Sequence, residues 1–479
     1  MKRLAAQAGA AMRWRATQLV GVQLIYFLRL LVLAALLAPD AFGLLAIASV
    51  ALSTLMRISD VGMVPALVQH AGATREQHDA AWTVGLMRAL LVTLALVVAA
   101  PLIAAAFKEP RATAIIQALA LRPTIEALAS IGIARLTREL KFRQLAFIYL
   151  PGAAVDLLVA VVLAPKIGVW ALVVGTLAGS ATMVALSHGF APHRPRIRFQ
   201  WSEIVPLVDF GRWVLASGVV TLAGTLLTQL AVSRLLGATA LGLFFLAVKL
   251  AYLPLDTANS IVGSVAFPMF ARLREDAAAS ARAFRTVLTG MYLLMLPGYA
   301  LIFALVPELE AVLGPQWTGT TPIVRILCVA GLASVAGNVL GPYLMGHGNA
   351  RGSFIVESMN TLVTVLAVWP CILLLQVNGA ALAWLIGGSA TLVFSVAWLR
   401  RLLPGMVAAS GRRLAAGAAV AVVAATVAWL VASPLAGLTG LVAGGLAGMV
   451  AGALLLWWQN FAFDLRLQEF GVLLRKRND

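Results

Sequence analysis

The segment TQLVGVQLIYFLRLLVLAALL (residues 17–37) is almost entirely apolar and holds a single charged residue, Arg29. An α-helix rises about 1.5 Å per residue, so a segment of this length crosses the hydrocarbon core of a bilayer, which is about 30 Å thick. Apolar runs of similar length recur along the 479-residue chain, which is 61% hydrophobic and 11% charged. A soluble protein of this size could not bury so much apolar surface. The sequence therefore predicts an all-α polytopic membrane protein.

These runs predict 14 transmembrane helices. In chain order they cover residues 16–37, 42–68, 80–106, 112–134, 145–164, 168–187, 211–236, 241–268, 286–307, 321–345, 353–375, 380–399, 414–433 and 437–458. The first run is longer than the apolar part of a signal peptide, so we expect it to be retained.

The basic residues predict the orientation of the spans. With the N-terminus in the cytoplasm, the inside segments hold 25 Lys and Arg residues, and the outside loops hold three, Lys108, Arg111 and Lys166. Lys and Arg accumulate on the cytoplasmic side of membrane proteins. We therefore predict that both termini are cytoplasmic. The same distribution accounts for the net charge of +17, and no nucleic-acid partner is expected.

An internal repeat divides the chain. The segment LLAPDAFGLLAIA (residues 36–48) aligns with LLGATALGLFFLA (residues 235–247) at an offset of 199, with six identities in 13 positions. Six predicted spans separate the two copies, so the repeats have parallel topology, an arrangement found in transporters. We predict two pseudo-symmetric six-helix lobes plus a C-terminal helix pair. The N-lobe covers residues 1–187, a cytoplasmic linker 188–210, the C-lobe 211–405, and the helix pair with its basic tail 406–479.

The last predicted span carries glycines every four residues, at Gly440, Gly444, Gly448 and Gly452. This spacing places glycine along one helix face and permits close packing of helices in a membrane. The alanine-rich run at residues 414–433 is the expected partner. We expect a monomer, with a homodimer contact through this pair as the alternative.

Charged residues inside the predicted spans are the candidate functional groups. Each costs about 2.5–3.5 kcal/mol at the centre of a membrane helix, so several must face protein or water. Beyond the first two residues of each span, the seven bases are Arg29, Arg57, Arg88, Arg122, Arg234, Lys249 and Arg325, and the five acids are Asp60, Glu126, Asp156, Asp256 and Glu357.

Helical spacing sorts these bases. Arg57 has Asp60 three residues later and Arg122 has Glu126 four residues later, so each can be neutralised on its own helix. Arg234 and Arg325 are expected near the outer surface, where a long side chain reaches the interface. The remaining three, Arg29, Arg88 and Lys249, have no acid at either spacing.

Lys249, Tyr252 and Asp256 share one face of a predicted span, and the repeat places Asp256 at the position of Arg57. We therefore expect both lobes to line one central cavity. Because guanidinium groups bind phosphate oxygens through paired hydrogen bonds, an anionic, phosphate-bearing substrate is expected. The predicted substrate-binding residues are Arg29, Arg88, Arg122, Lys249 and Arg57, and the residues predicted to balance charge or couple an ion are Asp60, Glu126, Asp156 and Asp256.

No catalytic residues, cofactor or metal are predicted. Cys328 and Cys371 fall inside apolar runs, and the five histidines fall in inside loops. No phosphate-binding loop or metal-ligand spacing is present in the sequence, so direct use of ATP is not expected.

Several motifs together resemble one family. They are LAPDAFGLLAIASV, AAWTVGLMRALL, FKEPRA, LTRELKFRQLAF, VWALVVG, RLLGATALGLFFLAVKLAYLP, FPMFARLREDAAASARAF and LGPQWTGTTPIVRIL. In order and spacing, over residues 10–405, they are similar to the polysaccharide transporter branch of the multidrug/oligosaccharidyl-lipid/polysaccharide exporter superfamily, the Wzx-type flippases.

The resemblance implies a bacterial inner-membrane flippase that alternates between inward and outward openings. Its substrate would be an undecaprenyl-pyrophosphate-linked oligosaccharide, with the polyprenyl tail remaining among the membrane lipids. A polysaccharide polymerase and its chain-length machinery are the protein partners that the resemblance suggests. One position departs from the pattern: relatives often carry arginine where this chain has Ala35, whereas the second lobe keeps Arg234.

Three alternatives remain. A multidrug exporter of the same superfamily carries organic cations and should have acids rather than arginines among its deep, unpaired groups. A lipid II flippase requires the same cationic cavity, and only the motifs favour polysaccharide. A polymerase or ligase acting on lipid-linked sugars should display catalytic residues outside, where the longest loop (residues 307–321) has only Glu308 and Glu310.

Overall fold

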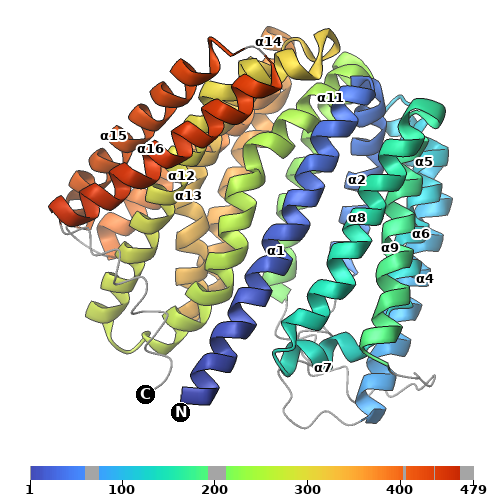
Figure 1. Cartoon of the computed structure of the whole chain (residues 1–479), viewed down its shortest axis with the longest axis horizontal. Helices are drawn as coiled ribbons and strands as arrows, with labels where there is room; N and C mark the ends of the chain where they lie inside the picture. Colours follow the sequence, from blue (N-terminus) through green and yellow to red (C-terminus); the bar gives the residue numbers. More distant parts are fainter. Residues whose placement is uncertain (1, 60–74, 193–211, 403–405, 436, 464–479) are drawn as a thin grey trace. The chain divides into compact units, whose positions relative to one another are not determined.

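The computed structural model describes residues 2–59, 75–192, 212–402, 406–435 and 437–463. Within these residues the regular structure is entirely helical (Figure 1). The helices are α1 (Lys2–Leu36), α2 (Pro39–Ile58), α4 (Arg75–Ala106), α5 (Ala112–Leu119), α6 (Leu121–Ala127), α7 (Gly132–Arg138), α8 (Phe142–Ile167), α9 (Trp170–Phe190), α11 (Arg212–Arg272), α12 (Ala277–Leu313), the 3₁₀ turn η3 (Pro315–Trp317), α13 (Thr320–Gly346), α14 (Ala350–Leu402), α15 (Met406–Ala432) and α16 (Leu438–Phe463).

Eleven helices in the described part of the chain are long and apolar enough to cross a membrane, and the bent α5–α7 region makes a twelfth span. Two of the eleven contain 42 and 50 such residues, whereas about 20 suffice for one crossing. Each therefore holds two spans, which brings the total to 14. The prediction of an all-α polytopic membrane protein is confirmed.

The two long helices are broken where the sequence separates predicted spans. Gly237 interrupts α11 with φ 85°, and Gln376 interrupts α14 with φ 52°. Glycine adopts positive φ without steric penalty, so the chain can reverse at Gly237. The second turn is tight, because a Cβ on Gly379 would overlap the carbonyl of Cys371.

The span predicted at residues 112–134 is a bent helical region rather than one continuous helix. The chain bends by 63° between α6 and α7. At the bend the backbone N–H of Ser130 donates to the hydroxyl of Ser187 at 2.9 Å, and the Ser130 hydroxyl donates to the carbonyl of Ala191. These bonds to the end of α9 replace those of a continuous helix, so the break is stabilised by tertiary contacts.

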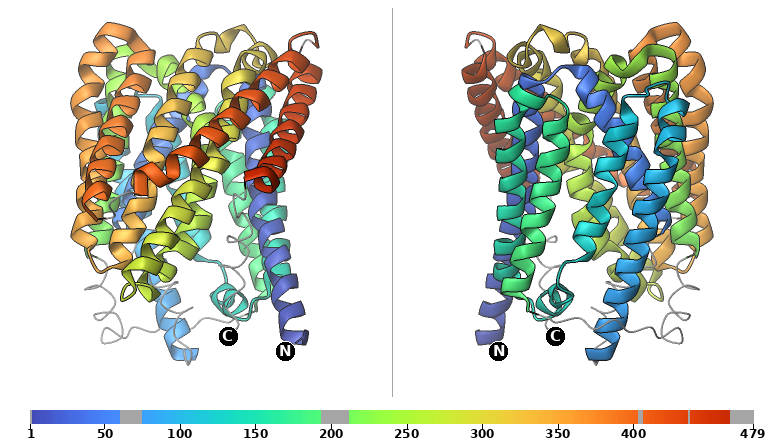
Figure 2. Two further views of the ribbon diagram at one scale, coloured as in Figure 1. Left: turned by 90° about the vertical axis from the view of Figure 1, so that its left-hand side faces the viewer. Right: turned by 90° about the vertical axis from the view of Figure 1, so that its right-hand side faces the viewer.

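The chain divides into two compact units. Unit 1 contains the helices from α1 to α9, the first part of α11 as far as Leu222, and residues 236–242. In it α1 packs along α8, α8 lies beside α9 (Figure 1 and Figure 2), and α9 contacts α5 and α6. Helices α2 and α4 complete the unit by packing on α5. The lobe boundaries expected from the sequence remain a prediction.

Unit 2 contains residues 223–235 and the chain from 243 onwards. Helix α12 contacts α13, α15 and α16, and α13 packs along α14. The glycine face of α16 meets alanines of α15, as predicted: a Cβ on Gly448 would lie 2.8 Å from Ala428 Cβ and 2.9 Å from Ala424 O. The glycines therefore allow the two helices to approach closely.

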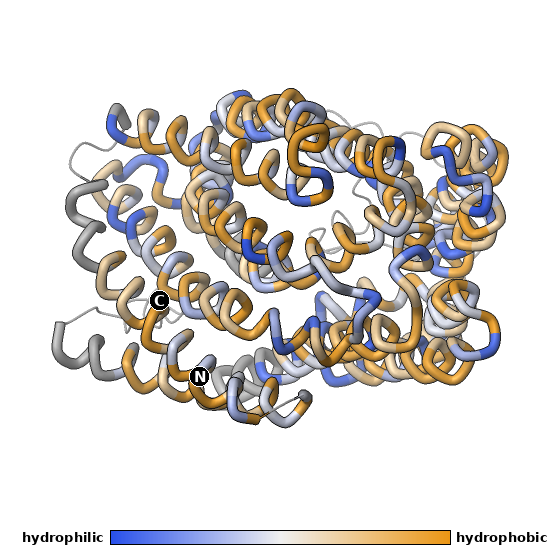
Figure 3. The backbone as a smooth tube through the Cα atoms, turned by 90° about the horizontal axis from the view of Figure 1, so that it is seen from above, coloured by the Kyte–Doolittle hydropathy of each residue, from blue (hydrophilic) through white to orange (hydrophobic). Residues whose placement is uncertain are grey.

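The surface is apolar. Leu102, Leu374 and Trp457 are 74%, 80% and 70% exposed, and Figure 3 shows apolar residues along most helical turns. Large exposed apolar side chains along whole helices are typical of a protein surface that contacts lipid.

The two copies of the repeat contact each other reciprocally within unit 1. Gly43 lies against the backbone of Ala238, and Gly242, its equivalent at the offset of 199, lies against the backbone of Pro39. Pro39 and Ala238 are themselves equivalent at the same offset. Reciprocal contacts of this kind arise between segments related by a two-fold axis. A glycine at each crossing is required because a Cβ would overlap the facing backbone.

Candidate functional site

Arg29 of α1 forms an ion pair with Asp156 of α8. The distance from Arg29 Nε to Asp156 Oδ1 is 2.9 Å, and the side chains are 15% and 6% exposed. Arg29 Nη2 donates to Leu172 O at 3.0 Å and to Thr176 Oγ1 at 3.1 Å. No acid lies three or four residues from Arg29 in the sequence. In the structure its acidic partner comes from another helix.

Small residues on α9 make room for Asp156. A Cβ on Gly179 would lie 2.7 Å from Asp156 Cβ, and a Cβ on Gly175 would lie 2.9 Å from Asp156 Oδ1. On the α8 side, a Cβ on Gly152 would lie 3.0 Å from Gly179 O. The close approach of α8 and α9 around Asp156 therefore depends on glycine at these three positions.

A second ion pair lies on α6, as the four-residue spacing predicts. Arg122 Nε donates to Glu126 Oε1 at 2.7 Å. The same carboxylate oxygen accepts a hydrogen bond from the Ser180 hydroxyl of α9 at 2.9 Å. The Arg122 side chain is 40% exposed, and among the described residues its hydrogen bond to Glu126 is made by Nε, which leaves the two Nη groups for a ligand.

One face of α9 supports both ion pairs. Leu172 O, Thr176 and Ser180 lie four residues apart, and together they bond Arg29 and Glu126. Asp156 also interacts electrostatically with Arg122. We call Arg29, Asp156, Arg122 and Glu126 the unit 1 charged cluster. Its formal charge is zero. All four groups interact electrostatically with Tyr26 of α1.

The other predicted residues of unit 1 lie elsewhere. Arg57 is exposed in the last turn of α2, and Asp60, its predicted partner, lies outside the described residues. Arg88 is half-buried on α4.

The predicted residues of unit 2 lie on α11. The Lys249 ammonium lies 5.5 Å from the centre of the Phe245 ring, and Lys249 and Asp256 are both exposed. Tyr252, between them, packs edge-on against Trp384 at 5.1 Å. The convergence of these groups with those of unit 1 on one cavity remains a prediction.

Arg325 lies against aromatic and backbone groups. Its Nε donates to Phe303 O at 3.1 Å, and its guanidinium lies 4.8 Å from the Phe303 ring. These contacts agree with the interpretation of Arg325 as a side chain near the surface.

In the described part of the chain, no three His, Cys, Asp or Glu side chains gather in a way that could hold a metal ion. The unit 1 charged cluster instead offers donors to an anion. Its arginines already hold internal carboxylates, so an anionic ligand must replace these partners or share the guanidinium groups with them. Of the three deep bases expected to lack an acid, Arg29 is paired with Asp156, which weakens the case against a multidrug exporter.

Sequence reasoning missed the contributions of α9. In the sequence, Thr176 and Ser180 do not differ from other small polar residues of an apolar span. Their spacing matches that of Gly175 and Gly179 on the adjacent row of the helix, and this pattern of small and hydroxyl residues could have indicated a polar helix interface.

The chain is similar to proteins of polysaccharide synthesis. Residues 32–322, more than half of the chain, match the model of a family described as polysaccharide biosynthesis protein. The lipopolysaccharide biosynthesis protein WzxC of Escherichia coli (strain K12) is 25% identical over 365 residues, covering 74% of this chain and 73% of WzxC. The succinoglycan biosynthesis transport protein ExoT of Rhizobium meliloti (strain 1021) is 24% identical over 388 residues, covering 81% and 76%.

Two solved structures have a similar fold. The lipid II flippase MurJ in an inward closed conformation matches with a TM-score of 0.70 at 15% identity, covering 94% of this chain and 99% of MurJ. An inward-facing multidrug resistance MATE transporter of the MOP superfamily matches with a TM-score of 0.65 at 15% identity, covering 82% and 99%. At this identity the similarity shows the fold alone.

Proposed function

Because the chain belongs to the polysaccharide biosynthesis protein family, we propose that it is a flippase for a lipid-linked oligosaccharide. It moves undecaprenyl-pyrophosphate-linked repeat units from the cytoplasmic to the periplasmic leaflet of the bacterial inner membrane. These units feed the synthesis of exopolysaccharide, capsule or O-antigen. The family match over residues 32–322 is the observation that carries this proposal, and the names of WzxC and ExoT support it.

The unit 1 charged cluster is the proposed phosphate-binding element. The half-exposed guanidinium of Arg122 offers its Nη groups to phosphate oxygens, while Arg29 is largely enclosed by Asp156 and Thr176. Arg57, Arg88 and Lys249 are the further proposed substrate-binding cations. In a partly dehydrated site, charge-assisted hydrogen bonds from arginine to phosphate are stronger than in water.

We propose that Asp156 and Glu126 balance the arginines while the substrate is absent. Without these carboxylates, two guanidinium groups would lie uncompensated within the spans, at a substantial free-energy cost. Proton or sodium coupling through these acids, or through Asp60 and Asp256, is the second role proposed for them.

Transport proceeds by alternating access, with the sugar headgroup crossing through the protein and the polyprenyl tail remaining in lipid. No chemical step on the sugar is proposed, and no cofactor. Both termini are placed in the cytoplasm, where the basic residues accumulate. A polymerase and its chain-length machinery, acting on the periplasmic side, are the proposed partners.

Deletion of the gene tests this function. We expect polyprenyl-linked repeat units to accumulate in the cytoplasmic leaflet while exported polymer is lost, and complementation with the full chain to restore both. Normal export of polymer from the deletion strain, in the absence of a second flippase gene, would refute the proposal.

The same strain separates the alternatives. A lipid II flippase predicts accumulation of peptidoglycan precursors and lysis, with polymer synthesis unaffected at first. A multidrug exporter predicts unchanged polymer and increased sensitivity to organic cations.

A further inference from the structure

Arginines and exposed aromatic rings alternate at one end of unit 1. The rings of Trp14, Phe147 and Phe190 form a row from α1 through α8 to α9, with centroid distances of 6.2 and 6.0 Å. The Arg143 guanidinium lies 5.8 Å from the Trp14 ring and 5.9 Å from the Phe147 ring, and the Arg15 guanidinium lies 5.3 Å from the Phe142 ring. We call these six residues the aromatic–arginine patch.

The patch continues a lipid-facing surface. Trp14, Phe147 and Phe190 are 36%, 44% and 40% exposed. Phe147 lies 11 residues, about three helical turns, before Leu158, which is 62% exposed on the same face of α8. The three rings therefore face the surrounding bilayer rather than the interior of unit 1.

The length of α8 favours a position of the patch near the lipid headgroups. Helix α8 has 26 residues and is therefore about 39 Å long, which exceeds the hydrocarbon thickness of about 30 Å. We therefore expect its first turn, which holds Phe142 and Arg143, to reach the interface, with Phe147 at the edge of the hydrocarbon. Aromatic residues concentrate at that depth in membrane proteins. This N-terminal end of α8 is predicted to face the cytoplasm.

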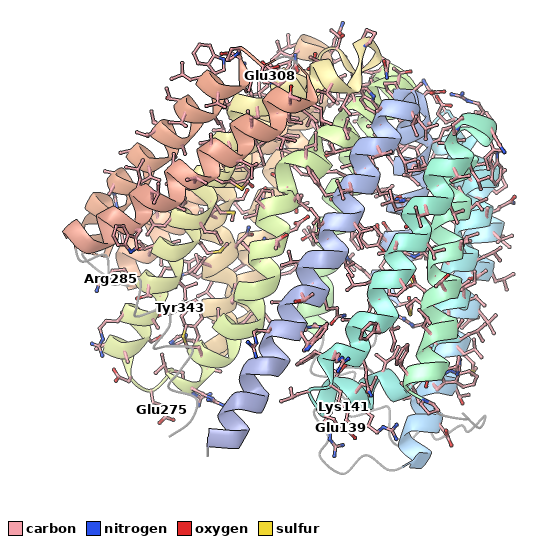
Figure 4. All side chains as sticks on the ribbon, viewed as in Figure 1. Glu139, Lys141, Glu275, Arg285, Glu308 and Tyr343 are labelled. Carbon is pink, nitrogen blue, oxygen red and sulfur yellow. The ribbon has the colours of Figure 1, made fainter. Side chains whose placement is uncertain are left out.

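The two arginines of the patch keep their charge uncompensated. Among the described residues, neither Arg15 nor Arg143 forms an ion pair; Arg15 donates only to the neutral side chain of Gln18, at 3.0 Å. Nearby Lys141 differs, because its ammonium lies 2.6 Å from Glu139 (Figure 4). The hydrogen bond from Lys141 lowers the pKa of Glu139, so that charge is neutralised internally.

We propose that the aromatic–arginine patch binds the phosphate of an anionic phospholipid headgroup in the cytoplasmic leaflet. The aromatic rings hold the guanidinium planes in place through cation–π contacts and pack against the glycerol and upper acyl chain. The free N–H groups of Arg15 and Arg143 then bind the phosphate oxygens. This site is separate from the unit 1 charged cluster and does not depend on the proposed transport function.

Native mass spectrometry of the delipidated full-length protein, titrated with dioleoyl-phosphatidylglycerol or dioleoyl-phosphatidylcholine, tests the site. A basic residue near an anionic surface contributes about 1 kcal/mol, or about fivefold in affinity. We expect the wild type to prefer phosphatidylglycerol, Arg143→Gln to lower the preference about fivefold, and Arg15→Gln/Arg143→Gln to abolish it. Lys141→Gln is the matched control and should keep the preference, because Glu139 already neutralises that charge.

Arg143 forms no hydrogen bond or ion pair with the residues that the structure describes, so Arg143→Gln should leave the fold intact. Phe147→Leu provides a second variant that retains both charges. The preference should fall in Phe147→Leu as well, because the ring no longer holds Arg143. An unchanged preference in Arg15→Gln/Arg143→Gln would overturn the proposal. The proposal would also be overturned if Arg15→Gln/Arg143→Gln weakened the binding of undecaprenyl phosphate but not that of phosphatidylglycerol. The patch would then bind the polyprenyl lipid.

Discussion

At the scale of single residues, the ion pair between Arg29 and Asp156 joins α1 to α8, and Arg29 also bonds α9. Arg29→Met would leave Asp156 buried without its partner. Removing one member of a buried ion pair costs about 3–5 kcal/mol, whereas replacing both members by apolar residues is often neutral. We therefore expect Arg29→Met to lower the Tm in detergent and Arg29→Met/Asp156→Leu to restore it.

Polymer export distinguishes a structural role of the Arg29–Asp156 ion pair from a role in transport. If Arg29 helps to bind substrate, the stable double variant remains unable to export polymer. Full export by the double variant would show that the pair acts only in packing.

Arg122 should behave differently, because its side chain is 40% exposed and its partner Glu126 also accepts a hydrogen bond from Ser180. We therefore expect Arg122→Gln to lower stability less than Arg29→Met does. Loss of charge-assisted hydrogen bonds to phosphate should lower transport about tenfold or more. Thermal unfolding and polymer export, measured on the same variant, test both statements.

Arg111→Gln is the matched control for Arg122→Gln. Arg111 also contacts carboxylates, Asp40 at 3.2 Å and Glu109 at 3.3 Å, but it lies in a loop between spans. Export should be normal in this variant. Equal losses of export from Arg111→Gln and Arg122→Gln would contradict a specific role for Arg122.

Only part of the site could be predicted from the sequence. The pair of Arg122 and Glu126 follows from helical spacing, because both residues lie on α6. The partner of Arg29 could not be identified in this way, since Asp156 belongs to a different helix and the packing of α1 on α8 decides which acid it meets. Thr176 and Ser180 escaped notice for the same reason.

At the scale of helices, the α15–α16 contact depends on glycine along one face. Gly448→Ala places a methyl group against Leu301 Cδ2 of α12, 2.8 Å from Ala428 Cβ and 2.9 Å from Ala424 O, and should cost about 1–3 kcal/mol through overpacking. Gly445→Ala is the matched control, since its Cβ meets only Leu305 Cδ1, at 3.7 Å. There the higher helix propensity of alanine should preserve or raise stability. A lower Tm for Gly445→Ala than for Gly448→Ala would contradict this packing.

The helices themselves were largely predictable, because lipid requires about 20 apolar residues per crossing. The breaks at Gly237 and Gln376 separate predicted spans as expected. The bend between α6 and α7 was not predicted, because the hydrogen bonds of Ser130 to Ser187 and Ala191 join segments about 60 residues apart. Hydropathy alone does not record such contacts.

At the scale of the whole molecule, the distribution of Lys and Arg predicts the orientation in the membrane. In a variant lacking Cys328 and Cys371, a cysteine placed at Lys108 should react with a membrane-impermeant maleimide in spheroplasts. A cysteine placed at Arg138, at the opposite end of unit 1, should react only after permeabilisation. The reverse pattern would invert the topology and with it the proposed direction of transport.

Reconstitution tests the central claim most directly. Proteoliposomes containing the purified protein and a polyprenyl-pyrophosphate-linked oligosaccharide would be treated with an impermeant glycosidase, and the digested fraction measured. We expect nearly complete digestion with the wild type, digestion about tenfold slower beyond the outer-leaflet share with Arg122→Gln, and digestion of only the outer-leaflet share in protein-free vesicles. Wild-type vesicles in which only the outer-leaflet share is digested would contradict the central claim.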